Sequence, residues 1–517
     1  MKNIFGILFT ASAAIALVSC SFLEERPDSF VSRDGYFKNE VQCRQAVNSA
    51  YAQLRTVFNG ANWIFTEGTT DIIYVPSSSD VNAIMDISPA HCNYATTLWN
   101  SAYKSIMYAN EAIQGISTSP LTDEQKASLI AEAKVMRAFW YYNLTCQFGD
   151  VPFYTEYVKD EDVMNRIARM GRMSAVKTRE ALINDLLESL GDVESGEAPA
   201  LPAVKAVEIE TGRGGWAMGQ MLIAKMAMWN AAKDDAANAT SWYIVAQNAL
   251  RQLEKVYGEL GQYPLSDLYF RNKNTPEVIF EIQHTYNTAG LSYTSNLATN
   301  CMPKKDGANE SDVFDGVQIP EMGTDTKVGT CSRPTLYFCQ ALQPNTGLDQ
   351  RAKINMAWDY NGTAFKSVSA KPWMGPKFWC PQMHQDLDHN NYPIFRYADA
   401  LLMMAECCCA LQDEAGFLKY INMVKSRAGL PAYTFSKWEK ALTEIQDERA
   451  RELFGEFQRK FDLVRWGIWY ERVQEYTDWD ILKVTLKPCH EYLPIPEKQV
   501  IYSGGALDNK EYNKYGL

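Results

Sequence analysis

Residues 394–429 read IFRYADALLMMAECCCALQDEAGFLKYINMVKSRAG, and they give the clearest indication of the fold class. Their apolar side chains recur every three or four residues, first at Phe395, Ala398, Leu402, Ala405 and Cys409 and then at Leu418, Ile421, Val424 and Ala428. That spacing predicts two amphipathic helices, the second of which ends at Gly429. Because one helix pair cannot bury its own apolar face, this pair must stack against further helices.

Helical patterns also occur elsewhere in both halves of the chain. We predict helices at residues 39–58, 97–115, 122–149, 174–191, 215–233, 240–258, 438–455 and 457–470. Thr122 and Gln125 form a capping-box pattern at the start of one of them. The helices fall into hairpins of about 34–45 residues, a period typical of tetratricopeptide-like repeats. The chain is therefore predicted to be mainly α, with stacked helix pairs, although no strict repeated consensus is present.

Residues 259–393 differ from the helical regions. They contain turn-forming residues, scattered aromatic side chains and one clear strand pattern at residues 278–283. An irregular stretch of this length inside a compact chain is often functional. No linker-like segment divides the chain, so we expect one compact domain. It comprises an N-terminal helical region at 20–258, an irregular, partly β lobe at 259–393, and a C-terminal helical region at 394–517.

The N-terminus has the pattern of a lipoprotein signal peptide. Lys2 precedes an apolar run of about 14 residues, which is too short to span a membrane and suits a signal peptide. Residues 17–20, Leu-Val-Ser-Cys, match a lipobox. We therefore expect residues 1–19 to be removed and Cys20 to carry a lipid anchor.

The composition excludes several classes of protein. The 517 residues are 46% hydrophobic and 22% charged, which is typical of a globular chain and not of a disordered one. The net charge of −12 disfavours nucleic acid as a partner. None of the 12 cysteines forms a Cys-x-x-Cys motif, so zinc ribbons and thioredoxin-type sites are excluded. We expect most cysteines to be small buried side chains, and disulfide pairing is not predictable.

Common catalytic and nucleotide-binding motifs are absent from the sequence. It has no nucleophile elbow, Rossmann glycine motif, P-loop or His-Glu-x-x-His motif. One cluster could be considered for a metal: Cys380, His384 and His389 with Asp386 and Asp388. Its spacing matches neither a calcium loop nor a transition-metal site, and we interpret it as a solvated polar loop. We predict a protein without cofactor or metal that is not an enzyme.

A set of motifs, in order along the chain, resembles the SusD/RagB family of outer-membrane nutrient-binding lipoproteins. After the lipobox comes the acidic segment Cys20–Pro27. The other motifs are EAKVMRAFWYYNLTCQFGDVP at 132–152, RYADALLMMAE at 396–406, VKSRAGL at 424–430, ERARELFGEFQRKFDLVRWG at 448–467 and YLPIP at 492–496. Each motif is weak alone, but their joint order is specific.

The resemblance implies about four tetratricopeptide-like helix pairs and a surface-facing, lipid-anchored protein of the outer membrane. It further implies a carbohydrate-binding protein that captures oligosaccharides and delivers them to a SusC-like TonB-dependent transporter for nutrient uptake. A peptide-capturing member of the family and, outside this class, a glycan hydrolase remain alternatives. Four charged residues of the motifs are expected in salt bridges between packed helices: Arg137, Arg396, Glu448 and Arg465.

A sugar site in water needs flat apolar faces for stacking and a few polar groups that orient hydroxyls. Trp140, Trp229 and Trp466 lie within helix patterns and are interpreted as core. The candidate ligand residues lie in two irregular stretches: Asp71, Tyr74, His91, Asn93 and Tyr94 in the first, and Tyr286, Tyr293, Trp358 and Tyr360 in the lobe. We expect both stretches to converge on one exposed face. The sequence does not identify the glycan.

Overall fold

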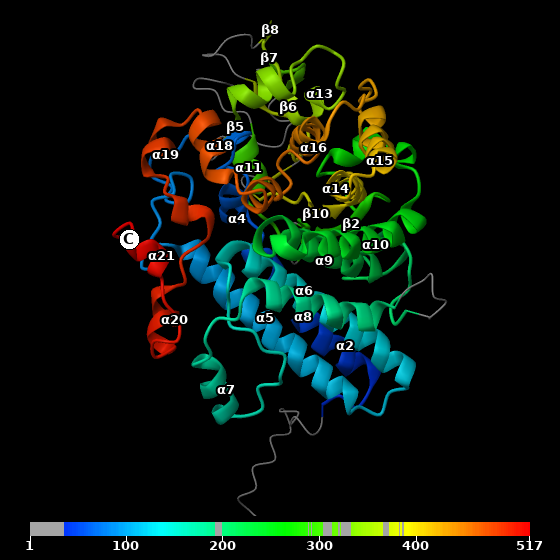
Figure 1. Cartoon of the computed structure of the whole chain (residues 1–517), viewed down its shortest axis with the longest axis vertical. Coiled ribbons are helices and arrows are strands. Elements are labelled where there is room, and N and C mark those ends of the chain that lie inside the picture. The colour runs from blue at the N-terminus through cyan, green and yellow to red at the C-terminus, as the bar shows by residue number, and fades with distance from the viewer. Residues whose placement is uncertain are drawn as a thin grey trace, which may run out of the picture.

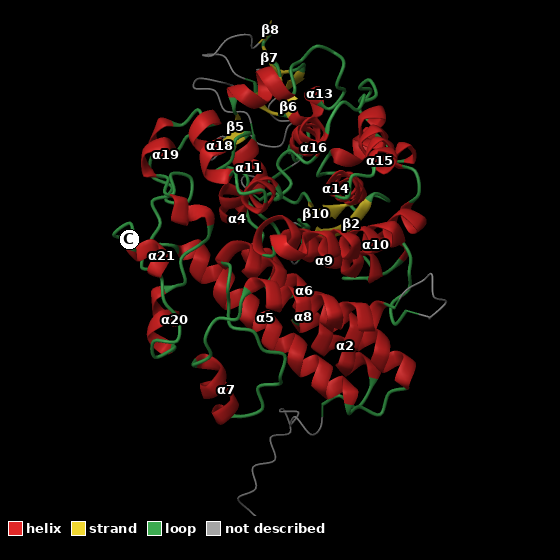
Figure 2. Cartoon of the chain, in the orientation of Figure 1, coloured by secondary structure: helices red, strands yellow, loops and turns green. Residues whose placement is uncertain are grey.

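The computed structural model describes residues 36–191, 199–287, 289–290, 292–302, 313–318, 321, 332–364, 372–381, 383–384 and 387–517. The signal peptide, the lipobox and Cys20 lie outside the described residues. Helices dominate the structure and strands are few and short (Figure 2). Within the ranges given above, no helix is long and apolar enough to cross a membrane.

Long helices form the scaffold, which confirms the prediction of a mainly α fold. They are α2 (Glu40–Ser49), α5 (Asn93–Ser117), α6 (Asp123–Phe148), α8 (Ala175–Leu190), α9 (Trp216–Trp229), α10 (Ala239–Tyr257), α14 (Tyr397–Ala410), α15 (Glu414–Arg427) and α16 (Trp438–Glu452). They pack in the series α5–α6–α8–α9–α10–α14–α15. Figure 1 shows this series rising from the lower half of the molecule to its upper right.

Shorter elements surround the scaffold. The helices are α3 (Leu54–Val57), α4 (Gly60–Thr66), α7 (Glu161–Ala168), α11 (Leu297–Cys301), α13 (Ala352–Asn355), α17 (Arg459–Arg465), α18 (Trp469–Tyr476), α19 (Asp480–Thr485), α20 (Glu497–Tyr502) and α21 (Lys510–Asn513). Along the left edge of Figure 1, the elements α18 to α21 form a border beside the scaffold.

The lobe is irregular and partly β, as expected. In the described part of the chain, one small antiparallel sheet has the order β4-β3-β7-β8, and the further strand pairs are β6–β9, β2–β10 and β1–β5, in which β1 comes from the N-terminal region. The strands are β1 (Ile73–Tyr74), β2 (Val278–Ile282), β3 (Val313–Phe314), β4 (Val317–Gln318), β5 (Arg333–Pro334), β6 (Met356–Ala357), β7 (Asp359–Tyr360), β8 (Thr363–Ala364), β9 (Trp373–Met374) and β10 (Tyr392–Arg396). The β6–β8 region lies at the top of Figure 1.

Helix ends follow the sequence signals at most places. The Gln125 amide donates to Thr122 Oγ1 at 3.3 Å, and the Thr122 amide donates to Gln125 Oε1 at 3.1 Å, which completes the predicted capping box. The helix predicted at 39–58 is instead divided into α2 and α3. At this break the Ala50 carbonyl accepts the Trp140 indole N–H at 2.9 Å, so its hydrogen bond is made outside a helix.

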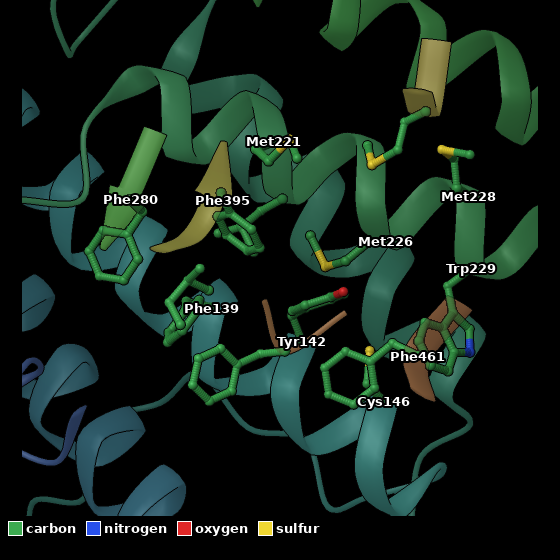
Figure 3. Close-up of a cluster of buried hydrophobic side chains, with 14 of the residues drawn as sticks. Phe139, Tyr142, Cys146, Met221, Met226, Met228, Trp229, Phe280, Phe395 and Phe461 are labelled. Carbon is green, nitrogen blue, oxygen red and sulfur yellow. The ribbon is translucent and has the colours of Figure 1, made fainter. Parts of the chain in front are cut away.

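The core lies where α6, α9 and α17 meet the β2–β10 pair (Figure 3). All residues of both strands are buried. Trp140 and Trp229 are core residues, as expected. Trp466 is half-buried, and its indole N–H donates to Glu406 at 3.0 Å.

All four motif residues form ion pairs, as expected, although only the pairs of Arg137 and Arg465 join two helices. Arg137 Nη2 lies 2.5 Å from Asp185 Oδ2, and Arg396 Nη1 lies 2.5 Å from Glu277 Oε1. The other two pairs are Glu448 with Arg351 and Arg465 with Glu406. The described cysteines are buried, apart from half-buried Cys489, which agrees with the role expected for most of them.

Candidate functional site

The candidate site begins at Asp71, a buried carboxylate on which two arginines converge. Arg459 makes a two-point contact, with Nε 2.8 Å from Oδ1 and Nη2 2.7 Å from Oδ2. From α18, Arg472 places Nε 3.0 Å and Nη2 2.8 Å from Oδ2. Burial would raise the pKa of Asp71, but the two guanidinium groups hold it below its ordinary value. Asp71 therefore ties its loop to the C-terminal helices.

The same loop pairs with the lobe. Strand β1 lies antiparallel to β5, with Tyr74 opposite Arg333. Just after β5, the Thr335 amide donates to the Ile72 carbonyl at 2.9 Å, and its hydroxyl donates to the Asp71 carbonyl at 2.7 Å. Three segments that are far apart in the sequence, 71–77, 333–337 and 472–479, consequently meet at one place.

Aromatic side chains gather where these three segments meet, and we call Tyr74, Tyr337, Tyr476 and Trp479 the aromatic cluster. Tyr74 and Trp479 are stacked, with ring centroids 6.5 Å apart and planes inclined by 19°. Tyr337 and Tyr476 are stacked at 3.9 Å and 26°. The Arg472 guanidinium lies 4.8 Å from the Tyr337 ring centroid and 4.7 Å from that of Tyr476. One cation thus contacts both rings of the second pair.

Hydrogen bonds hold the aromatic cluster in place. Arg472 Nη2 donates to the Tyr337 hydroxyl at 2.9 Å. The Trp479 indole N–H donates to the Ser77 carbonyl at 3.2 Å. In addition, the backbone amide of residue 336 donates a hydrogen bond to the side-chain carboxylate of residue 478 at 2.7 Å. Each segment is therefore tied to another by at least one of these bonds.

The aromatic cluster has the properties of a binding platform. Tyr337, Tyr476 and Trp479 are half-exposed, whereas Tyr74 is 8% exposed and supports Trp479 from within. The Arg472 side chain is 21% exposed. Aromatic faces beside N–H donors can stack on a sugar ring and orient its hydroxyls.

Further aromatic residues continue from Tyr74 into the lobe. The Arg333 guanidinium lies 3.9 Å from the Trp373 ring centroid. Phe314 contacts Trp373 at 5.7 Å and Tyr360 at 5.0 Å between ring centroids. Tyr360 is half-exposed, whereas Trp358 is 9% exposed and donates its indole N–H to the carbonyl of residue 352 at 2.8 Å. In this arrangement Trp358 contributes to the interior of the lobe.

Tyr94 lies in the core and not in the aromatic cluster. It is 4% exposed, and its hydroxyl donates to Gln147 Oε1 at 2.7 Å and accepts a hydrogen bond from the Asn62 amide. Its ring packs near Phe65, with centroids 5.5 Å apart. The Tyr94 hydroxyl is thus already engaged inside the protein.

His91 and Asn93 are exposed at another place, beside the C-terminal segment. The Pro89 carbonyl accepts the Glu497 amide N–H of α20 at 3.1 Å. The loop that carries Tyr74 at one end therefore brings His91 at its other end beside α20. The contact of Trp479 with Ser77 lies near the first end of the loop, and the contact of Glu497 with Pro89 lies near the second.

Tyr286 and Tyr293 occupy a different part of the lobe. Tyr286 stacks on His384 with ring centroids 5.4 Å apart. Tyr293 is 42% exposed, and the Arg55 guanidinium lies 4.1 Å from its ring centroid. The N-terminal region and the lobe thus meet at Tyr74 and again at Tyr293.

Sequence reasoning did not select Tyr337, Arg472, Tyr476 or Trp479. The helical pattern predicted for residues 457–470 indicates scaffold, and Tyr337 approaches this part of the chain only through the fold. A local signal was nevertheless present, because residues 469–479 read WYERVQEYTDW and contain four aromatic side chains. That density exceeds what one buried helix face requires.

The Cys380 loop offers no metal site among the described residues, where no group of three potential ligands is found. Cys380 Sγ lies 3.4 Å from His389 Nδ1. Burial raises the pKa of Cys380 and lowers that of His389, so the pair does not favour a thiolate and an imidazolium. His384 stacks on Tyr286, and Asp386 lies outside the described residues.

Two protein-family models match the sequence. Residues 382–512 match the model described as the SusD family. Residues 21–190 match the model described as starch-binding associating with outer membrane. The two matched segments together cover more than half of the chain.

Similar proteins were found by sequence and by structure. A SusD-like protein from Formosa agariphila is 28% identical over 557 aligned positions, which cover 96% of each chain. A SusD homolog from Bacteroides thetaiotaomicron has a TM-score of 0.71 at 18% identity, covering 93% of this chain and 98% of that one. Surface glycan-binding protein A from the same species, in complex with laminarihexaose, has a TM-score of 0.66 at 21% identity, covering 90% and 98%.

Proposed function

The chain belongs to the SusD/RagB family, and on this premise we propose that it is a glycan-binding protein that captures oligosaccharides. The observation that carries the proposal is the aromatic cluster, in which half-exposed rings adjoin the partly exposed Arg472. The complex of a structurally similar glycan-binding protein with laminarihexaose supports a saccharide as the ligand. Stacking on Trp479 and hydrogen bonds from Arg472 are the interactions that we assign to the sugar.

The proposed location is the outer face of the outer membrane, where a lipid on Cys20 anchors the protein. The lipobox at residues 17–20 supports the anchor. A family description that includes association with the outer membrane supports the location. The protein would then pass captured oligosaccharide to a SusC-like TonB-dependent transporter. The stacked helices offer an extended surface for that partner.

Binding without catalysis suits the chemistry of this site. Asp71 is the carboxylate at the base of the aromatic cluster, and both its oxygens are bound by arginines. With its pKa held below the ordinary value, Asp71 is a poor general acid. The relatives are named as SusD-like and glycan-binding proteins, which also favours binding.

Calorimetric titration with a panel of neutral oligosaccharides that includes laminarihexaose tests the proposal. Replacing Trp479 with Ala should weaken the binding of the preferred oligosaccharide about tenfold, which corresponds to about 1.4 kcal/mol. Tyr502→Ala is the matched control, because Tyr502 is 66% exposed on α20 and outside the aromatic cluster. The bound sugar should be recovered uncleaved. Unchanged affinity in Trp479→Ala would remove the aromatic cluster as the binding site.

A further inference from the structure

A second feature is a set of three cations, Arg55 on α3 and Arg271 and Lys273 in the lobe, which we call the cationic group. The chain carries a net charge of −12, yet none of these three residues forms an ion pair with a described carboxylate. Arg55 and Arg271 are exposed and Lys273 is half-buried. Arg55 and Lys273, which bind neighbouring carbonyls, therefore bring positive charge together on an acidic protein.

The protein contacts of these cations are neutral. Arg55 Nη1 donates to the carbonyl of residue 283 at 3.4 Å, and Lys273 Nζ donates to the next carbonyl, that of His284, at 2.8 Å. Arg271 Nη1 donates to the carbonyl of residue 376 at 2.9 Å. The Arg55 guanidinium lies 4.1 Å from the Tyr293 ring centroid. Both guanidinium groups keep further N–H donors, because each has five and each protein carbonyl uses one.

His284 lies beside two of these cations. It is 4% exposed, and neither ring nitrogen has a hydrogen-bond partner among the residues that the structure describes. Burial, followed by the charges of Arg55 and Lys273, lowers the pKa of His284 to about 4. Burial also lowers the pKa values of Lys273 and Arg271. Positive charge is thus partly removed from water here. Glu281 and Asp388 offset it only in part at Lys273, and neither forms an ion pair with that amine.

We propose that the cationic group binds an oxyanion carried by a sugar, either a uronate carboxylate or a sulfate ester, and so selects acidic oligosaccharides. This inference rests on the proposed glycan-binding function and names the class of glycan. A guanidinium stacked on an aromatic ring can still present two parallel N–H groups to an oxyanion. Tyr286 follows His284 by two residues, and its ring stacks on His384 from the Cys380 loop, which provides a flat surface for the sugar ring.

Calorimetry with three oligosaccharide classes tests the inference. The probes are oligogalacturonate for carboxylate, chondroitin sulfate oligosaccharide for sulfate ester, and laminarihexaose as the neutral reference. The double variant Arg55→Gln/Lys273→Gln should lose at least tenfold in affinity for the preferred acidic probe and retain its affinity for the neutral one. The matched control Arg169→Gln/Lys177→Gln removes the same charge from two exposed positions, one directly after α7 and one on α8, and should change neither affinity. Equal losses in both double variants would mean that only overall charge matters, which overturns the inference.

A second measurement separates this inference from the proposed function. Inorganic sulfate alone should shift the imidazole NMR signals of His284 in the native protein and leave them unmoved in the Arg55→Gln/Lys273→Gln variant. The single variant Arg55→Lys keeps both positive charges and should retain the sulfate response. Suppose that the protein binds laminarihexaose but shows no preference for the acidic probes and no response to sulfate. This result would overturn the inference about acidic glycans and leave the proposed glycan-binding function intact. Failure of every oligosaccharide to bind overturns the proposed function, whatever the sulfate result.

Discussion

Glu67 is a buried carboxyl group whose protonation is coupled to folding. Its Oε1 accepts the amide N–H groups of Gln458 at 2.6 Å and Arg459 at 3.1 Å, while Oε2 has no hydrogen-bond partner among the described residues. Burial, only partly offset by these bonds, raises the pKa of Glu67 to about 8. The folded protein therefore holds a proton here at neutral pH.

This coupling predicts a pH-dependent contribution to stability. In the unfolded chain the carboxyl loses its proton above its ordinary pKa of 4.5, whereas the folded chain keeps the proton until about pH 8. The contribution of Glu67 to the free energy of unfolding should therefore fall between about pH 4.5 and 8, by at most about 1.4 kcal/mol per pH unit. Glu67→Gln should abolish that slope. Urea unfolding at several pH values measures it, and parallel pH profiles of the two proteins would contradict the account.

At the scale of single residues, the sequence shows which side chains could bind a sugar but not which of them are buried in the core. The sequence predicts Tyr74 as a ligand residue, and it lies in the aromatic cluster, next to the lobe. The same pattern predicts Tyr94, twenty residues later, but Tyr94 lies in the core. The two tyrosines differ in what surrounds them, and those neighbours, such as Trp479 and Gln147, come from distant parts of the chain.

At the scale of elements, Gly375 fixes how closely strand β9 approaches the segment before β6. Its amide donates to the Asn355 carbonyl at 2.8 Å. A Cβ at this position would lie 2.6 Å from the Asn355 carbonyl carbon and 2.6 Å from the Ile354 carbonyl oxygen, both of which are backbone atoms. Only a residue without Cβ allows this approach.

Gly375→Ala should therefore destabilise the protein by about 1–3 kcal/mol, because the backbone of the lobe must shift. Gly261→Ala is the matched control, since a Cβ there meets no atom within 4 Å and should change stability by less than about 1 kcal/mol. Thermal unfolding of both variants gives the comparison, and hydrogen exchange should locate the Gly375 effect in β6 and β9. Equal midpoints for the two variants would show that the close approach is unimportant.

Helices and strands could be predicted where their bounds depend on neighbouring residues, and not where the bounds depend on contacts with distant parts of the chain. The capping box at Thr122 and the strand at 278–282 depend on neighbouring residues and were found as predicted. The break between α2 and α3 coincides with a hydrogen bond from Trp140, which is 90 residues away from Ala50. No pattern within residues 39–58 contains that information.

At the scale of the whole molecule, the scaffold was more predictable than the site. Helix periodicity and family motifs indicated the helix stack, because every repeat carries its own signal. The aromatic cluster instead joins residues near 74, 337 and 476, and their proximity depends on pairs such as Asp71 with Arg472. Such contacts link segments hundreds of positions apart and leave no periodic trace in the sequence.

Anchoring is also a property of the whole molecule. Cys20→Ala should release the protein from the membrane fraction, because the lipid attached to Cys20 is the proposed anchor. Cell fractionation followed by immunoblotting measures the distribution. Cys489→Ala serves as the control, since Cys489 is a half-buried free cysteine in the C-terminal region and should leave membrane association unchanged. Equal membrane association of Cys20→Ala and native protein would contradict the anchor.

We propose that the three segments around Asp71 create an oligosaccharide-binding platform. A crystal structure of the native protein with its preferred oligosaccharide would show where the sugar lies. We predict a sugar ring stacked on Trp479 or Tyr337, with Arg472 donating a hydrogen bond to a hydroxyl or ring oxygen. Density for the oligosaccharide at another surface, with the aromatic cluster unoccupied at saturating ligand, would contradict it.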